Sequence, residues 1–115
     1  MDRVLRWYID GNISRVKTEV GGTYILDGNY VAEWVHLTAR VAGRGDEPTI
    51  VDINDDGVSI LTYNPALMNN QTAHLWTTVS PATLRENSVI TCDIDQVSSE
   101  DTCRDLTVEL GLRKV

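Results

Sequence analysis

Apolar and polar residues alternate with a period of two along most of the chain, which is the spacing of β-strands. The longest such segment is residues 30–41, YVAEWVHLTARV, where the odd positions are almost wholly apolar and the even positions are amphipathic. This pattern predicts a long strand with one face in the core. Shorter alternating segments contain Leu5, Trp7 and Ile9; Val16, Thr18 and Val20; Ala73, Leu75, Thr77 and Val79; Ile90, Cys92 and Ile94; and Leu106, Val108 and Leu110.

Turn-forming residues separate these segments. They are Asp10-Gly11-Asn12, Gly21-Gly22, Asp27-Gly28-Asn29, residues 43–48, Asp56-Gly57 and Asn64-Pro65. Only residues 80–87, SPATLREN, could form a helical turn. About eight or nine short strands without helices predict an all-β fold, an antiparallel β-sandwich of jelly-roll type. We expect residues 11–115 to form this single domain, because that length suffices for one hydrophobic core.

One stretch, IVDINDDGVSIL over residues 50–61, matches the opening of a calcium-binding loop. Such a loop also needs a bidentate Glu at its twelfth position, and the twelfth residue counted from Asp52 is Tyr63. A two-residue turn at Asp56-Gly57 instead places Ile53 opposite Ile60 and Val51 opposite Thr62, with the apolar residues on one face. The sequence therefore favours a β-hairpin over a metal site.

Composition and charge exclude several partners. The formal net charge is −7 and the pI is near 4.6, so we expect neither nucleic acid nor an anionic membrane surface to bind. No apolar run approaches the length of a membrane span, and the N-terminus lacks the apolar stretch of a signal peptide. The sequence thus contains no feature that would direct the protein to secretion.

Candidate catalytic groups are few. His36 and His74 each lie beside a tryptophan within a predicted strand, which is more typical of a surface or interface residue than of a base. Asp93 and Asp95 share a strand face and could be a carboxylate pair, but no partner groups accompany them. Zinc-ligand spacings, a nucleophile elbow and a phosphate-binding loop are absent from the sequence. We therefore expect no enzymatic activity, no cofactor and no metal.

Cys92 and Cys103 are an even pair in a small β-protein, which suggests a disulfide. Cys92 shares a face with Ile90 and Ile94, however, whereas Cys103 has the parity opposite to Leu106. If both strands are regular, the two side chains point to opposite faces, and only a bulge or an early strand end would let them meet. We therefore expect free thiols, as in a reducing cytoplasm.

Two segments, TIVDINDDGVSIL and NSVITCDIDQVSSEDTCRDLTVEL, resemble a β-sandwich module that recurs in structural proteins of tailed bacteriophages. The module pairs a V-D-I-N-x-[DN]-G-x-S-I hairpin with a later L-T-[VC]-D-I-D-Q-V-G-S…D-L-T-V hairpin. The sequence departs from it where Glu86-Asn87 replaces a Gly-Asp and Ser98 replaces a Gly, which affects turn geometry more than fold. The matching residues are 51–54, Gly57, Ser59, Ile60, Thr91, 93–97, Ser99 and 105–108.

The resemblance implies a non-enzymatic virion protein that forms a homotrimer. A small free-standing trimer is similar to a head-decoration (cement) protein, which binds the phage major capsid protein and stabilises the capsid. The alternative is a tail-fibre or tail-tip module that binds a host receptor or carbohydrate. In either case we expect the protein in the virion, and in the host cytoplasm during assembly.

Aromatic residues on the amphipathic strand faces suggest where such a protein makes contacts. We expect Tyr30, Trp34 and His36 on one face and His74 and Trp76 on the matching face of another strand, forming a subunit interface. The alternative, equally supported, is that this face is the second inner face of the sandwich.

The N-terminal segment, residues 1–10, precedes the first glycine turn and lies outside the part that resembles the phage module. Its apolar positions Leu5, Trp7 and Ile9 must be held by the chain's own sandwich, a neighbouring protomer or the capsid. We expect an arm that pairs with another chain by strand addition, with Trp7 as its anchor.

Overall fold

The computed structural model describes residues 2–77, 79 and 83–115. These residues form ten strands and no helix, so no helix in them could span a membrane. The long strands are rich in β-branched and aromatic residues, which pack well on a pleated surface. The strands are β1 (Arg3–Asn12), β2 (Tyr24–Ile25), β3 (Tyr30–Val41), β4 (Thr49–Asp55), β5 (Val58–Ser59), β6 (Ala66–Leu67), β7 (Ala73–Trp76), β8 (Thr83–Leu84), β9 (Val89–Gln96) and β10 (Arg104–Lys114).

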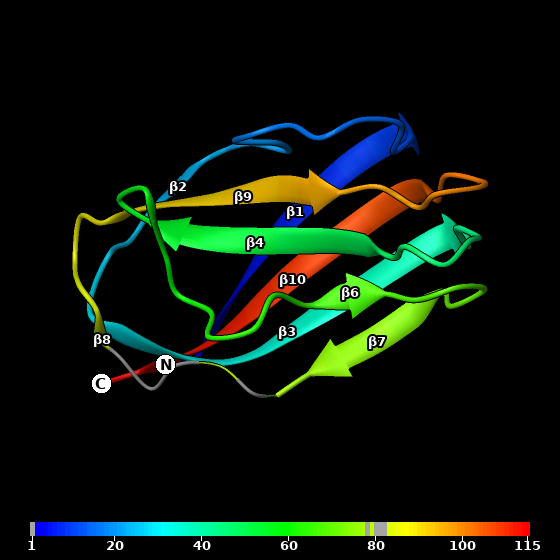
Figure 1. Cartoon of the computed structure of the whole chain (residues 1–115). Coiled ribbons are helices and arrows are strands. Elements are labelled where there is room, and N and C mark those ends of the chain that lie inside the picture. The colour runs from blue at the N-terminus through cyan, green and yellow to red at the C-terminus, as the bar shows by residue number, and fades with distance from the viewer. Residues whose placement is uncertain (1, 78, 80–82) are drawn as a thin grey trace.

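The strands form two antiparallel sheets, which confirms the predicted all-β sandwich; jelly-roll connectivity stays a prediction. The first sheet has the order β1-β10-β3-β7, with β8 also paired to β3. The second has the order β2-β9-β4-β5, with β6 also paired to β4. In Figure 1, β9 and β4 cross in front of the first sheet. The largest fully buried side chains come from both sheets: Leu5, Trp7, Leu37, Leu106 and Leu110 from the first, and Ile53, Ile90 and Ile94 from the second.

A bulge in β3 divides the alternation of this long strand into two parts. Trp34 pairs with Gly111 and Ala32 pairs with Leu112, so Glu33 is an extra residue without a partner in β10. An extra residue shifts the side-chain parity by one. Val35 and Leu37 therefore face the core from odd positions, whereas Tyr30, which is only 4% exposed, faces it from an even position.

The acidic stretch forms the predicted two-residue hairpin. Asp56 and Gly57 have φ angles of 49° and 84°, the left-handed conformation that a type I′ turn requires at both positions. The amide of Ile60 donates to the carbonyl of Ile53 over 3.0 Å, as expected. Val51 is not opposite Thr62, because β5 ends at Ser59 and the amide of Val51 donates to the carbonyl of Pro65 instead.

Two other local expectations differ from the structure. Residues 16–20 form no regular strand; Lys17 makes an isolated bridge to Ile94 instead. The helical turn expected over residues 80–87 lies partly outside the described residues, and Thr83–Leu84 form strand β8.

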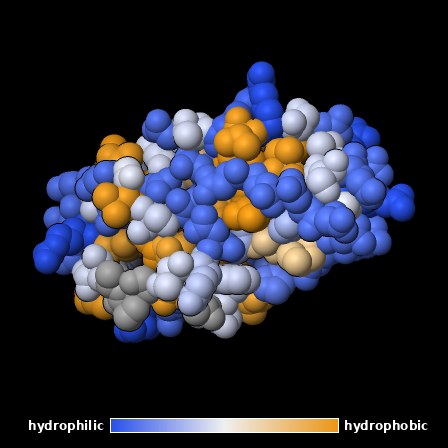
Figure 2. All heavy atoms as spheres, in the orientation of Figure 1, coloured by the Kyte–Doolittle hydropathy of each residue, from blue (hydrophilic) through white to orange (hydrophobic). Residues whose placement is uncertain are grey.

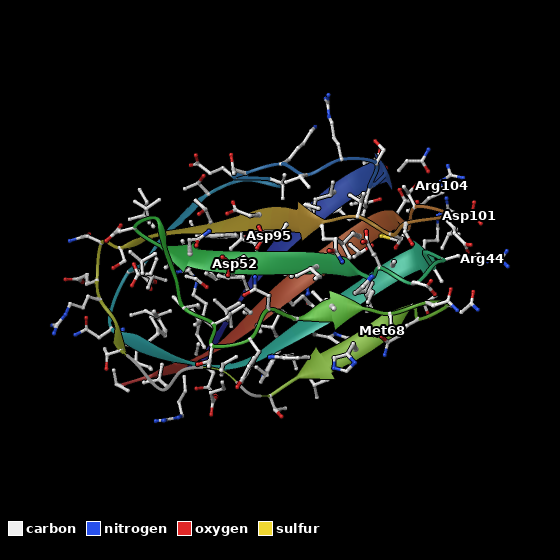
Figure 3. All side chains as sticks on the ribbon, in the orientation of Figure 1. Arg44, Asp52, Met68, Asp95, Asp101 and Arg104 are labelled. Carbon is white, nitrogen blue, oxygen red and sulfur yellow. The ribbon has the colours of Figure 1, made fainter. Side chains whose placement is uncertain are left out.

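At the end of the sandwich opposite β8, two loops are connected by a hydrogen bond from the amide of Arg44 to the carbonyl of Asp101, over 2.8 Å (Figure 3).

Both cysteines are free and buried. The predicted free thiols are confirmed, although the parity argument for them does not apply, because Cys103 precedes β10 and is fully buried, like Cys92. The hydroxyl of Thr49 donates to the Cys103 sulfur over 3.5 Å. Burial raises the pKa of both thiols, so the folded protein keeps them protonated and unreactive.

Candidate interaction surface

The predicted N-terminal arm is instead part of the sandwich. Strand β1 pairs with β10 from Arg3 to Ile9, and Leu5 and Trp7 are both completely buried. The indole nitrogen of Trp7 donates to the carbonyl of Gly22 over 3.1 Å. The division into an arm, residues 1–10, and a separate domain, residues 11–115, is therefore wrong. The apolar side chains of this segment are held by the chain's own core.

The outer edge of β1 is also unsuited to strand addition. The hydroxyl of Tyr24 donates to the carbonyl of Arg6 over 2.6 Å and accepts from its amide over 3.3 Å. The Tyr24 ring packs edge-on against Trp7, with 5.4 Å between ring centroids. The Tyr24 side chain thus occupies the main-chain groups of Arg6, in the middle of β1, with which an added strand would pair.

The five remaining predicted interface residues do not share one face. Trp34 and His36 lie half-buried on the outer face of the first sheet. His74 and Trp76 pair with Leu37 and Val35, whose side chains are buried, so they point toward the sandwich interior. For Tyr30, His74 and Trp76 the alternative of a second inner face is therefore correct. The bulge turns Tyr30 of β3 inward, and the register of β7 with β3 places His74 and Trp76 inward.

Trp34 is the centre of an apolar area on the outer face of the first sheet. Its indole lies over Gly111 of β10, where a Cβ would overlap the ring. Leu75 of β7, directly opposite His36, is 58% exposed and lines a shallow hollow with Trp34 and His36. On the other side of Gly111, Val4 of β1 is 47% exposed. Sequence reasoning missed both residues: alternation alone would have placed Leu75 in the core, and it placed Val4 on the face opposite to Leu5 and Trp7 without indicating a contact there.

An ion-pair network crosses the same face beside Trp34. Arg6 Nε donates to Glu109 Oε2 over 2.9 Å, and His36 Nδ1 lies 3.3 Å from Glu109 Oε1. Hydrogen bonds from Arg6 are the largest cause that holds the pKa of Glu109 below its usual value. The charges of this face are thus paired across three neighbouring strands, which leaves the exposed apolar groups as its main means of contact.

A second acid network lies at the end of the same face. Asp105 accepts hydrogen bonds from Arg40 Nε at 2.6 Å and from the amide of Gly11 at 2.7 Å. These two bonds lower the pKa of Asp105 to about 2. Asp105 itself has a positive φ of 55°, an uncommon conformation that its short polar side chain tolerates. The network connects β1, β10 and β3 where the three strands begin or end.

The outer face of the second sheet carries several carboxylates: Figure 3 labels Asp52 and Asp95 on this face, where Figure 2 shows hydrophilic and hydrophobic residues mixed. Asp52 and Asp93 are directly opposite on β4 and β9, and Asp95 follows on β9. Their carboxylates accept hydrogen bonds from neighbouring segments. Asp52 accepts from the Ser59 hydroxyl and the Ile53 amide, Asp93 from the Asn54 side chain and the Glu19 amide, and Asp95 from the Asn64 side chain. Burial, then the charges of Asp52 and Asp93, raise the pKa of Asp95. Among the described residues, no group of acidic, histidine or cysteine side chains could hold a metal ion.

The two histidines are engaged in polar contacts. His36 contacts Glu109, and His74 Nδ1 lies 3.1 Å from the Gln71 amide nitrogen. Asp93 and Asp95 serve the network just described, and the two thiols are buried and protonated. The described residues thus present two surfaces for contact: one mixed apolar face on the first sheet and one acidic face on the second.

Comparison with known proteins identifies the fold. No protein-family model and no curated protein matches the sequence. Solved structures do match. A chain in the capsid asymmetric unit of cyanophage Pam1 has a TM-score of 0.60 and 14% identity, covering 96% of this chain and 83% of that one. A chain in the capsid of Ralstonia phage GP4 has a TM-score of 0.58 and 11% identity, covering 100% and 85%.

Proposed function

We propose that this protein is a structural protein of a tailed-bacteriophage virion: a non-enzymatic head-decoration (cement) protein that binds the capsid as a homotrimer. The observation that carries the proposal is the similarity to chains from two phage capsid structures, which extends over 96% and 100% of this chain and over 83% and 85% of the matched chains. The two hairpin motifs that resemble phage structural modules support it independently. The part that matches this sandwich makes up most of each matched chain, 83% and 85% of its length.

The surface also suits an accessory protein. The molecule measures 41 × 22 × 21 Å, and the hollow at Trp34 on the outer face of the first sheet is shallow and apolar. One face is apolar around Trp34 and the other is acidic, so it can contact different partners on opposite sides. A trimer of such subunits could occupy threefold or quasi-threefold positions of a capsid lattice and bridge neighbouring shell subunits.

Localisation in the virion tests this proposal. Antibodies against the purified protein, used on particles of the phage that encodes it, should label heads in electron microscopy. Purified protein should also sediment with shells assembled without it. Labelling confined to the tail would instead support a host-binding tail module, and absence from purified particles would contradict a structural role altogether.

A further inference from the structure

The distribution of charge along the sequence singles out one segment. Residues 57–84 contain no Asp, Glu, Lys or Arg, although 23% of the chain is charged. A typical stretch of this length would hold about six or seven charged residues. The segment supplies β5, β6, β7 and β8, of which the last three lie along the lower half of Figure 1. We call the described part of this segment, residues 57–77, 79, 83 and 84, the uncharged flank.

Within the uncharged flank, β7 is an edge strand of the first sheet. The amide of Ala39 donates to the carbonyl of Thr72 over 2.8 Å, which sets the alternation of hydrogen bonds between β3 and β7. The main-chain groups of Ala73 and Leu75 consequently point away from the sheet. No other described residue hydrogen-bonds to them, and no described strand pairs with this edge.

Edge strands are normally protected against association by charges, proline or a covering side chain. Strand β1, the opposite edge of the sheet, has this protection in Tyr24 and carries Arg3 and Arg6. Strand β7, with the sequence AHLW, has no charged residue, and its Leu75 is exposed beside the hollow at Trp34. Of the two edges of the first sheet, β1 is therefore protected against association, whereas β7 carries none of these protecting features.

The net charge indicates which partner such a flank would accept. A cationic partner would be attracted to the acidic second sheet rather than to a neutral edge. Two copies of this chain, each with a formal charge of −7, repel one another over their acidic surfaces. The uncharged flank is where they can approach at the lowest electrostatic cost, with main-chain hydrogen bonds and apolar side chains available for contact.

We propose that the uncharged flank is the contact between copies of this chain, with the β7 edge of each subunit packed against the uncharged flank of its neighbour. This inference deepens the homotrimer of the proposed function, on which it rests. Of the strands that carry the predicted interface residues it keeps β7, with His74 and Trp76, and it makes Leu75 and the main-chain edge of that strand the groups in contact.

Two charge-matched variants test the contact. Leu75→Glu places a carboxylate in the proposed contact, and Ile25→Glu places one at a similarly exposed residue on β2 of the other sheet, 63% exposed against 58%. Light scattering should find wild type and Ile25→Glu as trimers of the 12.8-kDa chain. Leu75→Glu should dissociate to monomers, with subunit affinity weakened by roughly tenfold or more. Circular dichroism should show all three folded.

Two measurements on the wild type keep the inference testable if a variant misfolds. Raising the ionic strength should strengthen association, because salt screens the net repulsion and the contact contains no ion pairs to weaken. The amides of Ala73 and Leu75 should exchange with solvent faster in dilute monomer than in concentrated trimer. A monomeric wild type, a trimer that survives Leu75→Glu, or dissociation by added salt would each overturn the inference. Labelling of virion heads would still support the decoration function in those cases.

Discussion

Asp105 combines an unusual backbone conformation with the most strongly perturbed carboxylate of the first sheet. Its φ is positive, and its side chain accepts hydrogen bonds from Arg40 and from the Gly11 amide. Both bonds stabilise the ionised form, which is why the pKa falls to about 2 from an ordinary value of 3.8. Asn adopts the same backbone conformation readily, so Asp105→Asn removes the charge without adding strain.

The lowered pKa of Asp105 predicts a pH-dependent effect of Asp105→Asn on stability. A carboxylate with a lowered pKa in the folded state stabilises the protein above its ordinary pKa, and this contribution is lost as the pH falls through the folded-state pKa. The variant should therefore be less stable than wild type at pH 7, and the difference should shrink between about pH 4 and pH 2. Urea unfolding at both pH values checks this. An equal loss of stability at pH 7 and pH 2 would show that the hydrogen-bond geometry, rather than the charge, matters.

At the scale of strands, alternation predicted which residues share a face where a strand is regular, but it failed for Tyr30 across the bulge in β3 and did not always show which face is buried. The hairpin at Asp56-Gly57 was predictable because its turn type demands those residues. The inward orientation of His74 and Trp76 was not, because β7 alternates between exposed apolar and half-buried aromatic residues and only its register with β3 decides. The bulge at Glu33 has no local signal, since it follows from the pairing of β3 with β10.

The β1 edge was missed for a related reason. Alternating apolar residues in a terminal segment are compatible with both an arm and an edge strand, and only long-range contacts distinguish the two. Tyr24, more than a dozen residues away, supplies the hydroxyl that closes this edge at Arg6. The absence of charge over residues 57–84, by contrast, is visible in the sequence and could have indicated the other edge.

Removal of the Tyr24 hydroxyl should therefore open the β1 edge. Tyr24→Phe leaves the ring against Trp7 and deletes the two hydrogen bonds to Arg6, so we expect a loss of about 0.5–1.5 kcal/mol in the free energy of unfolding. The Arg6 amide should also exchange faster with solvent. Tyr63→Phe, at a tyrosine that is 65% exposed, is the matched control and should change neither quantity. Unchanged exchange at Arg6 in Tyr24→Phe would contradict the capping role.

At the scale of the whole molecule, the two sheets differ in how they keep their shape. The first sheet has its charges paired across strands, in the Arg6–Glu109–His36 network and at Asp105. The second sheet places Asp52 opposite Asp93, and like charges at that position are destabilising unless hydrogen bonds compensate. Both sheets bury their inner faces in one core, and β1 contributes Trp7 and Leu5, two of the largest fully buried side chains of that core.

Deletion of residues 1–9 tests that conclusion directly. The deletion removes Leu5 and Trp7 from the core and leaves the outer edge of β10 unpaired, so the truncated chain should lose its β-sheet circular dichroism and aggregate. A milder pair of variants separates core packing from strand pairing. Trp7→Ala should cost about 3–5 kcal/mol, whereas Tyr8→Ala, its 52%-exposed neighbour on the outer face, should cost far less. A soluble, folded truncated protein would show instead that the segment is a dispensable arm, because a core lacking its largest buried side chain could not otherwise persist.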